Sequence, residues 1–426
     1  MLAAGSCKIS SHSNKNGMLN HYGLKVKFPK HILSIVFTLL SAKAVLAQDE
    51  SRFPKIDELL QTAVDEDKVI GHSALVFHQG KVVYYDDWGK RNKRKDRDVE
   101  RDTIFRIYSM SKPITSVAVM QLVESGKLGL DDPVEKHLPA FAELKVLDGD
   151  EKVDPRRRMK IRDLLRHTSG LTYGFFGNTA VDKAYRNKGI LFADKNLEEM
   201  VEKLGDIPLL YHPGQRFHYS ASTDVLGRVV EVVSGQRFAD YLKEKIFDPL
   251  EMEDTSFSVP RDKLPRLAEL YRGEDGDLKP ASPLTSFRFV NATDFDSGGG
   301  GLCSTIDDYL KFCQMLLGNG KVNGKQILKA ETLEMMFTNQ LGDQVEEASR
   351  SFQFGLGFRI SARGDYSWGG AAGTRFWVNP EQQLAILYMV QINPYGSRNW
   401  GSQVRSLVYE SLEEEERTGV TKRSNK

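Results

Sequence analysis

Cysteine is scarce in this sequence, since Cys7, Cys303 and Cys313 are the three among 426 residues. So few cysteines cannot form the disulfide framework of a small secreted domain, although an oxidising compartment would allow a bond between Cys303 and Cys313. The nine histidines form no HExxH or HxH pattern, so no metal site is predicted and no cofactor is expected. A G-x-S-x-G motif is absent too, which removes the usual α/β-hydrolase signature.

An excess of charge of one sign and a long apolar run are missing as well. The 59 basic and 58 acidic residues nearly cancel, and the basic run "KRNKRKDRD" at 90–98 contains no aromatic residue. We therefore expect this run to be a solvated loop, and we expect no nucleic-acid partner. The apolar run from Ile32 to Leu40 is too short to span a bilayer comfortably, so no stable membrane insertion is expected.

Residues 1–47 have the pattern of a secretory signal peptide. A lysine-bearing start precedes the apolar run, and the small residues Val45 and Ala47 predict cleavage after Ala47. Met18 would begin a signal of more usual length, so it is an alternative start. The protein is therefore expected to be periplasmic or secreted, with a membrane anchor as the alternative.

The order of apolar patterns predicts one α+β domain over 48–412, followed by a charged disordered tail at 413–426. Period-two and β-rich patterns predict a hairpin at 73–89 and strands at 354–360, 366–380 and 384–392. Helical patterns lie at 55–68, 109–125, 161–171, 222–235, 238–252 and 402–412. Because the strands lie at both ends of the chain, we predict one antiparallel sheet flanked by helices, with an inserted, mainly helical lobe.

Candidate chemistry lies in "RIYSMSKPITS", residues 106–116, where several hydroxyl groups surround Lys112. Residues three apart on a helix share a face, so Lys112 can face Ser109 but not Ser111; Ser116 shares that face deeper in the helix. The proline in this stretch is tolerated only in a first helical turn, which places Ser109 beside free N–H groups that stabilise an alkoxide. A lysine can then act as the base that serine needs. The alternative is a helix-capping serine beside a surface lysine.

Two further stretches favour the catalytic interpretation. In "PGQRFHYSAS", a turn leads to Tyr219 immediately before a predicted helix, where its phenol can project into a cleft and act as a base near Lys112. The alternative is a half-buried core tyrosine. In "WGGAAG", Trp368 is followed by glycines inside a strand pattern, which suits the close approach of a substrate backbone and a second oxyanion N–H. The alternative there is a bulge or a bend.

Together with "LLRHTSGL", "SGGGGLCST" and "FGLGF", these stretches resemble the serine β-lactamase-like family, which includes class C β-lactamases, DD-carboxypeptidases, D-aminopeptidases and family VIII esterases. The resemblance covers nearly all of residues 55–412. It implies that Ser109 is the acylated nucleophile, that Lys112 is its base, and that Tyr219 is the second base and later proton donor. It also implies an oxyanion hole formed by the N–H groups of Ser109 and Ala371, with Trp368, Gly369 and Gly370 binding substrate.

The sequence departs from the family pattern at two motifs. The second motif is commonly Y-x-N, but Ala221 stands where the amide would be. The third is commonly K-T-G or H-x-G, but here Trp368 opens it, and a tryptophan cannot hold a substrate carboxylate. Tryptophan at this place resembles the carboxylesterase branch and favours apolar acyl or alcohol groups.

We therefore expect a serine hydrolase that cleaves carboxylic esters through an acyl-enzyme, with a small-molecule ester or amide as its partner. An amidase of β-lactamase, D-aminopeptidase or DD-carboxypeptidase type is the alternative, and a non-catalytic binding protein is a third interpretation. The aromatic-bearing loops at 172–189 and 284–297 are expected to shape the pocket. The physiological substrate and the oligomeric state are left open.

Overall fold

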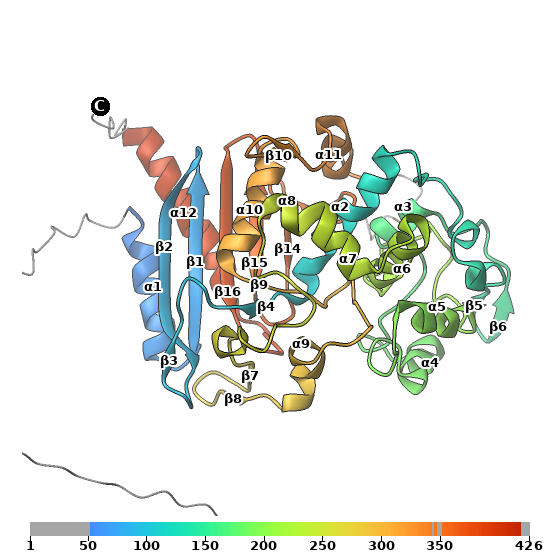
Figure 1. Ribbon diagram of the computed structural model, residues 1–426, viewed down its shortest axis with the longest axis horizontal. Helices are drawn as coiled ribbons and strands as arrows, with labels where there is room; N and C mark the ends of the chain where they lie inside the picture. The colour runs from blue at the N-terminus through green and yellow to red at the C-terminus, as the bar shows by residue number, and fades with distance from the viewer. Residues whose placement is uncertain (1–51, 343–344, 347–351, 419–426) are drawn as a thin grey trace, which may run out of the picture. The chain divides into compact units, whose positions relative to one another are not determined.

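The computed structural model describes residues 52–342, 345–346 and 352–418, so the predicted signal peptide lies outside the described residues. Within them, eight strands form an antiparallel sheet in the order β12-β13-β14-β15-β16-β1-β2-β3 (Figure 1). These strands are β1 (Gly71–His78), β2 (Lys81–Asn92), β3 (Arg97–Asp98), β12 (Gln353–Phe354), β13 (Arg359–Ile360), β14 (Tyr366–Gly369), β15 (Arg375–Asn379) and β16 (Leu384–Val390). Segments from both ends of the chain meet at the pairing of β1 with β16, which confirms the predicted α+β fold.

Helices cover both faces of this sheet, so every residue of β16 is buried. The covering helices are α1 (Pro54–Asp65), α12 (Trp400–Thr418), α2 (Ser111–Glu124) and α10 (Ile306–Leu317). Figure 1 shows α1 and α12 on one side of the sheet and α10 and α2 on the other. Alternate residues of a strand face opposite sides, so Phe376 packs in the core beneath α2 and α10, whereas Trp377 packs beneath α1 and α12.

A mainly helical lobe is inserted between α2 and α10, as the helical patterns predict. Its helices are α3 (Ile161–Leu165), α4 (Ala180–Lys188), α5 (Leu197–Gly205), α6 (Ser222–Ser234), α7 (Phe238–Leu242), α8 (Asp248–Leu250) and α9 (Phe287–Val290). The lobe also contains the short strands β5 (Val146–Asp148), β6 (Glu151–Val153), β7 (Tyr271–Arg272) and β8 (Lys279–Pro280). After α10 come the short strands β10 (Lys321–Val322) and β11 (Lys325–Gln326), and then the helix α11 (Ala330–Phe337). The lobe returns to the sheet where β4 (Phe105–Arg106) pairs with β9 (Cys303–Ser304).

Several predicted boundaries are wrong. The predicted helix at 109–125 begins instead with the 3₁₀ turn η1 (Tyr108–Met110), and α2 starts at Ser111. The single strand predicted at 354–360 is two short strands, because the glycine-containing segment between them turns the chain, with φ of +95° at Gly357. The strand predicted at 366–380 likewise turns back on itself between β14 and β15.

The two charged segments also differ from expectation. Residues 413–418, predicted to belong to a disordered tail, form the last turns of α12; the rest of that tail lies outside the described residues. Ion pairs Arg363–Glu413 and Arg52–Glu415 hold these turns to the body. The basic run at 90–98 is the hairpin of β2 and β3, in which Lys90 pairs with the carboxylates of Asp96 and Asp98 at 2.8 and 2.6 Å.

Candidate active site

Ser109 lies in the middle of η1, at the point where β4 turns into the buried helix α2. The preceding residue, Tyr108, has φ of +42°, a left-handed conformation that is costly for a bulky side chain. The ring of Phe289 packs edge-on against Tyr108 at 5.3 Å and so supports this conformation. The sharp turn places the half-buried Ser109 just before the N-terminus of α2, whereas the sequence predicted that Ser109 begins the helix itself.

Lys112 lies one turn after Ser109 and is the most buried cation at the site, with 2% of its surface exposed. Its Nζ donates to Ser109 Oγ at 3.3 Å and to the backbone oxygen of Gly299 at 2.5 Å. It also lies 4.7 Å from the ring centroid of Tyr219 and 5.2 Å from that of Tyr173. The Lys112 amine is therefore held by one carbonyl and two aromatic rings, and it lies within hydrogen-bonding distance of the serine oxygen.

Tyr219 ends the turn that precedes α6, and its Oη donates to Ser109 Oγ at 2.8 Å. Its ring is fixed by three aromatic neighbours: His167 at 4.9 Å, Tyr173 at 5.2 Å and Trp368 at 5.5 Å between centroids. The structure thus brings Ser109, Lys112 and Tyr219 together, and the serine oxygen lies within hydrogen-bonding distance of both partners.

Trp368 lies on β14 and faces Tyr219, as its ring contact shows. The turn that follows packs against the residues before the nucleophile: a Cβ at Gly370 would overlap the carbonyl oxygen of Ile107. Among the described residues, the N–H of the exposed Ala371 donates no backbone hydrogen bond. Ala371 is therefore placed to donate to a substrate oxygen, and its role in an oxyanion hole, with Gly369 and Gly370 as substrate-binding backbone, stays a prediction.

Asp224 on α6 is a component of the site that the sequence patterns did not indicate. Its buried carboxylate accepts hydrogen bonds from the hydroxyl of Ser297 and, at 3.0 Å, from the N–H of Gly299. Burial raises the pKa of Asp224, and the nearby Lys112 charge opposes that rise. Asp224 therefore positions the glycine-rich segment whose carbonyl at Gly299 receives Lys112.

Glycine is required at position 299, because a Cβ there would overlap the Asp224 carboxylate and the Tyr173 hydroxyl group. The pairing of β4 with β9 brings this "SGGGG" segment beside Ser109, although 190 residues separate Ser109 from Gly299. No local sequence signal could have given this contact. The run of four glycines is a pattern that suits close backbone approach, but no role was predicted for it.

Two more ionisable groups adjoin Tyr219. Burial, and next the neighbouring Tyr219, raise the pKa of Tyr173 well above its ordinary value. Burial, followed by the charges of Lys112 and His218, lowers the pKa of His167 well below its ordinary value. Both side chains therefore remain neutral near pH 7, and the lysine faces a polar but uncharged aromatic wall. Tyr173 was expected among the aromatics that shape the pocket; a role for His167 was not predicted.

Ser111, the second serine of the segment Ser109–Lys112 (the SxxK segment), has a structural role. Ser111 is fully buried, and its Oγ donates to the carbonyl of Tyr108 at 2.6 Å and accepts from the N–H of Leu302 at 3.1 Å. Ser111 therefore holds the nucleophile turn against the glycine-rich segment. This geometry agrees with the prediction that Ser111 does not face Lys112.

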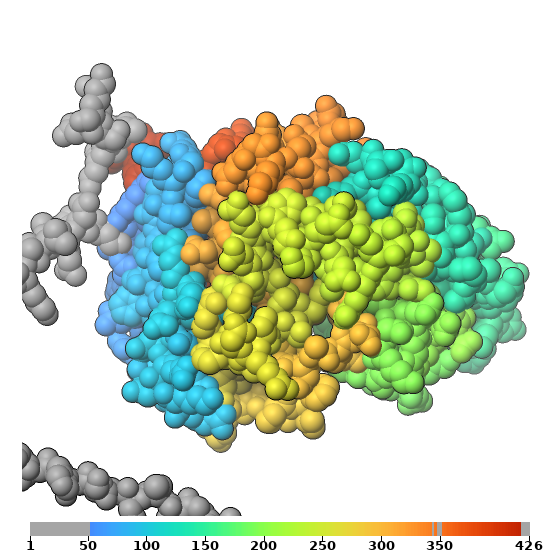
Figure 2. Space-filling view, in the orientation of Figure 1, coloured from blue at the N-terminus to red at the C-terminus, as the bar shows by residue number. Residues whose placement is uncertain are grey.

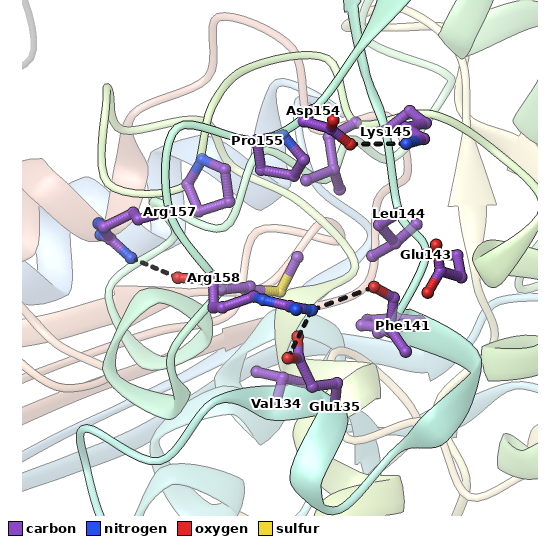
Figure 3. A pocket seen from close by; sticks show the side chains of 14 residues that line it. Val134, Glu135, Phe141, Glu143, Leu144, Lys145, Asp154, Pro155, Arg157 and Arg158 are labelled. Carbon is purple, nitrogen blue, oxygen red and sulfur yellow. Dashed lines mark hydrogen bonds and ion pairs between the residues drawn. The ribbon is translucent and has the colours of Figure 1, made fainter.

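The described residues contain no cluster of three or more side chains suited to a metal ion. They also contain no helix long and apolar enough to cross a membrane. Cys303 and Cys313 are both buried free thiols, so the bond considered between them is not formed. A cavity of about 410 Å³ beside Arg157 and Arg158 is lined by none of the candidate catalytic residues (Figure 3).

A serine with a lysine one turn later and a tyrosine from an inserted helical lobe, on an antiparallel sheet built from both chain ends, defines the class of serine β-lactamase-like acyl-transfer proteins. Residues 56–404 match the sequence model of the beta-lactamase family, and the chain belongs to that family.

Individual relatives agree with this assignment. Protein Rv1367c of Mycobacterium tuberculosis is 33% identical, and the alignment covers 79% of this chain and 89% of the relative. Esterase EstB of Burkholderia gladioli is 29% identical over the same shares of the two chains. The structure of EstCE1, described as a hydrolase with promiscuous acyltransferase activity, superimposes with a TM-score of 0.75 at 28% identity, covering 85% of this chain and 99% of that one. The relatives therefore include both esterases and acyltransferases.

Proposed function

We propose that the protein is a serine esterase that acts through an acyl-enzyme. The observation that carries this proposal is the placement of Ser109 Oγ within 3.3 Å of Lys112 Nζ and 2.8 Å of Tyr219 Oη, with Trp368 beside them. Serine needs a base to become a nucleophile, and here two groups are in reach of its proton. Similarity to EstB and EstCE1 supports ester hydrolysis.

In the first half of the reaction, Ser109 Oγ attacks the ester carbonyl carbon, and its proton passes to the uncharged amine of Lys112. The negative charge that develops on the carbonyl oxygen is stabilised by the N–H groups of Ser109 and Ala371. Collapse of this intermediate breaks the bond to the alcohol, which leaves with a proton from Tyr219. Water then attacks the acyl group on Ser109 and gives a proton to the Tyr219 phenolate, and Lys112 returns its proton to Ser109 Oγ as the carboxylic acid is released.

Preference for esters over carboxylate-bearing β-lactams or peptides follows from β14 and β15. Trp368 lies on the face of the sheet toward Ser109, where a lysine or histidine would hold a substrate carboxylate. The nearest cations by register are Arg375, which pairs with Gly369, and Arg359 of β13, which pairs with Ser367. Alternate residues of a strand face opposite sides of the sheet, so Arg375 lies on the face covered by α1 and α12. Trp377 and Tyr395 belong to the core on that face. These two strands therefore supply no cation beside the nucleophile.

Exposed aromatic side chains next to Tyr219 favour an apolar acyl or alcohol group. Phe175 stacks on Tyr173 at 5.0 Å, Phe176 lies 6.1 Å from the Tyr219 ring, and Phe192 lies 6.4 Å from Phe175. We call Phe175, Phe176 and Phe192 the mouth aromatics. Phe176 is 66% exposed and Phe192 is 74% exposed, so they offer apolar area that a substrate can cover.

Arginines hold the mouth aromatics in place. Arg186 on α4 donates to the carbonyls of Gly174 and Gly177, which flank Phe175 and Phe176. Arg288 on α9 donates to the carbonyl of Phe192 at 3.0 Å. An apolar surface braced in this way favours substrates with more than a short acetyl group, because a pre-ordered wall loses little entropy on binding.

Kinetics on p-nitrophenyl esters beside a chromogenic cephalosporin test the proposal. We expect a higher kcat/KM for the ester, and we expect Ser109→Ala to abolish the activity. A higher kcat/KM for the cephalosporin would favour the β-lactamase alternative instead. Ester hydrolysis that persists in Ser109→Ala would remove this serine from its proposed role.

Export is a separate proposal. The apolar run and the small residues before position 48 support a cleaved signal peptide. Sequencing the N-terminus of the protein recovered from its native cells tests this, and we expect it to begin at Gln48. An intact N-terminus in the cytoplasmic fraction would contradict export.

A further inference from the structure

A second cavity, of about 560 Å³, lies away from the catalytic serine. It is formed by the tip of the β2–β3 hairpin, the segment before β7, and the 3₁₀ turn η6 (Pro283–Ser286) that leads into α9; these elements meet at the lower edge of Figure 1. Figure 2 shows the cyan hairpin and the yellow segment side by side there. None of Ser109, Lys112 and Tyr219 lines this cavity.

The charged side chains that line it are strongly unbalanced. They are Arg94, Lys95, Arg97, Arg106, Arg261 and a single carboxylate, Glu269. Glu269 already accepts from Arg94 and, at 3.0 Å, from the Tyr271 hydroxyl group. In the described part of the chain, Lys95, Arg97 and Arg261 form no ion pair. The cavity therefore carries a net positive charge that its own carboxylate does not offset.

Arg106 is the deepest of these cations, with 3% of its surface exposed. One nitrogen, Nη1, donates to the carbonyl of Ala268 at 2.7 Å and to Gln391 Oε1 at 3.2 Å. Its buried Nε has no hydrogen-bond partner, and no carboxylate pairs with it, among the residues that the structure describes. A buried guanidinium without an anion is costly, so this arginine is suited to receive one.

The cavity in Figure 3 provides an internal comparison. Its cations are neutralised locally: Arg158 pairs with Glu135 and Lys145 pairs with Asp154, each at 2.6 Å. That cavity therefore needs no external anion, although its volume is similar. The excess positive charge is therefore a property of the cavity beside Arg106, and the cavity in Figure 3 does not share it.

The remaining wall is apolar and includes Leu264, Leu267 and Val290. A volume of this size accommodates a small organic molecule. A guanidinium attracts a carboxylate, and the exposed rim cations Lys95 and Arg261 add to that attraction. We propose that this cavity binds a small organic carboxylate, with its carboxylate toward Arg106 and its apolar body against these three side chains.

Isothermal titration of the full chain with octanoate tests the proposal, with octanamide as the uncharged analogue and inorganic phosphate as the anion without an apolar body. We expect octanoate to bind at one equivalent, at least about tenfold more tightly than either of the other probes. Equal binding of octanamide would show an apolar cavity only, and equal binding of phosphate would show a simple anion site. Either result, or no binding of octanoate, overturns the proposal.

Variants locate the bound octanoate. Arg106→Gln should abolish binding, but it also removes the bond to Ala268 and so can prevent folding. The double variant Lys95→Gln/Arg261→Gln changes exposed rim cations and should weaken octanoate binding about tenfold, since each lost attraction is modest. Lys127→Gln, an exposed lysine outside the cavity, is the matched control and should not change it. Unchanged binding in the double variant, with loss in Trp368→Ala, would place octanoate at the active site and overturn the proposal.

Discussion

The hydroxyl of Tyr219 donates to Ser109 Oγ at 2.8 Å, although 110 residues separate the two in the sequence. The contact joins the inserted helical lobe to the turn η1, which carries Ser109 between β4 and α2. Because Lys112 lies in the first turn of α2, immediately after the 3₁₀ turn that carries Ser109, local geometry brings the lysine beside its serine. Tyr219 is placed by the packing of the lobe, so the tyrosine couples the integrity of the lobe to catalysis.

Tyr219→Phe removes the phenol and keeps the ring that packs on His167, Tyr173 and Trp368. We expect kcat for a p-nitrophenyl ester to fall by about 10² to 10⁴, with little change in KM, because proton transfer is lost and the apolar contacts remain. Steady-state kinetics and thermal unfolding measure both effects. Tyr211→Phe, at a half-buried tyrosine outside the catalytic trio, is the control. A kcat within about threefold of that of the unaltered protein would show that Lys112 alone carries out the proton transfers.

The two serines of the SxxK segment should separate chemistry from stability. Ser109→Ala should abolish turnover while changing Tm little, because Tyr219 keeps its aromatic contacts and Lys112 keeps its bond to Gly299 when the hydroxyl is removed. Ser111→Ala should keep most of the activity but lower the free energy of unfolding by about 1–3 kcal/mol, since it leaves the buried N–H of Leu302 without its acceptor. Parallel assays and denaturant unfolding distinguish the two. Loss of turnover in a folded, stable Ser111→Ala would reverse the assignment of the nucleophile.

Asp224→Asn should change how stability depends on pH. Burial raises the pKa of Asp224 in the folded state, so between the ordinary carboxyl pKa and that raised value the folded protein binds more protons than the unfolded chain. This carboxylate therefore costs stability as pH rises through that range, and the cost is absent below it. Asparagine keeps an acceptor for Ser297 and Gly299 without the charge. The Tm of the variant minus that of the unaltered protein should therefore increase from pH 4 to pH 8.

Thermal unfolding of both proteins in matched buffers measures this difference. Subtracting one curve from the other cancels the other titrating groups. A difference that stays flat, or that decreases with rising pH, would show that the buried charge is fully compensated by Lys112 and its hydrogen bonds.

The mouth aromatics should govern the preference for acyl chain length. Phe176→Ala should raise KM for p-nitrophenyl octanoate by about 5- to 30-fold, the factor expected for losing 1–2 kcal/mol of apolar contact, and should leave the acetate ester within about twofold. Met335→Ala changes another exposed apolar side chain on α11, at the opposite edge of Figure 1 from α9, and should alter neither ester. Equal effects on the two esters would mean that these rings do not contact the acyl chain.

The parts of the site that the sequence predicted are those set by short-range geometry. The three-residue spacing of Ser109 and Lys112 on one helix face needs no tertiary information, and the turn before α6 marked Tyr219. Asp224 and Gly299 could not be predicted in the same way, because an aspartate inside a helix and a glycine run carry no indication of each other. Their contact depends on α6 packing against α2 and on β4 pairing with β9, a match of two residues on each side.

The wrong strand and tail boundaries have similar causes. Alternation predicted the sheet but not its interruptions, because the turn at Gly357 depends on left-handed backbone that only the folded environment selects. Composition made residues 413–418 a disordered tail, whereas the ion pairs Arg363–Glu413 and Arg52–Glu415 join this segment to residues far away in the chain. Charge counting treated the run at 90–98 as a loop, but its acidic residues pair across a hairpin with Lys90.

The positions near the glycine-rich segment tolerate substitution much less than the positions of the mouth aromatics. At Gly299 any side chain would collide with Asp224 and Tyr173, so evolution has almost no freedom where Lys112 is held. The mouth aromatics lie on surface loops held by arginines from neighbouring helices, where side chains can be exchanged without disturbing that contact. Substitutions at Phe176 and Phe192, by natural selection or in the laboratory, can therefore shift the range of accepted acyl groups while leaving the contacts of Lys112 unaltered.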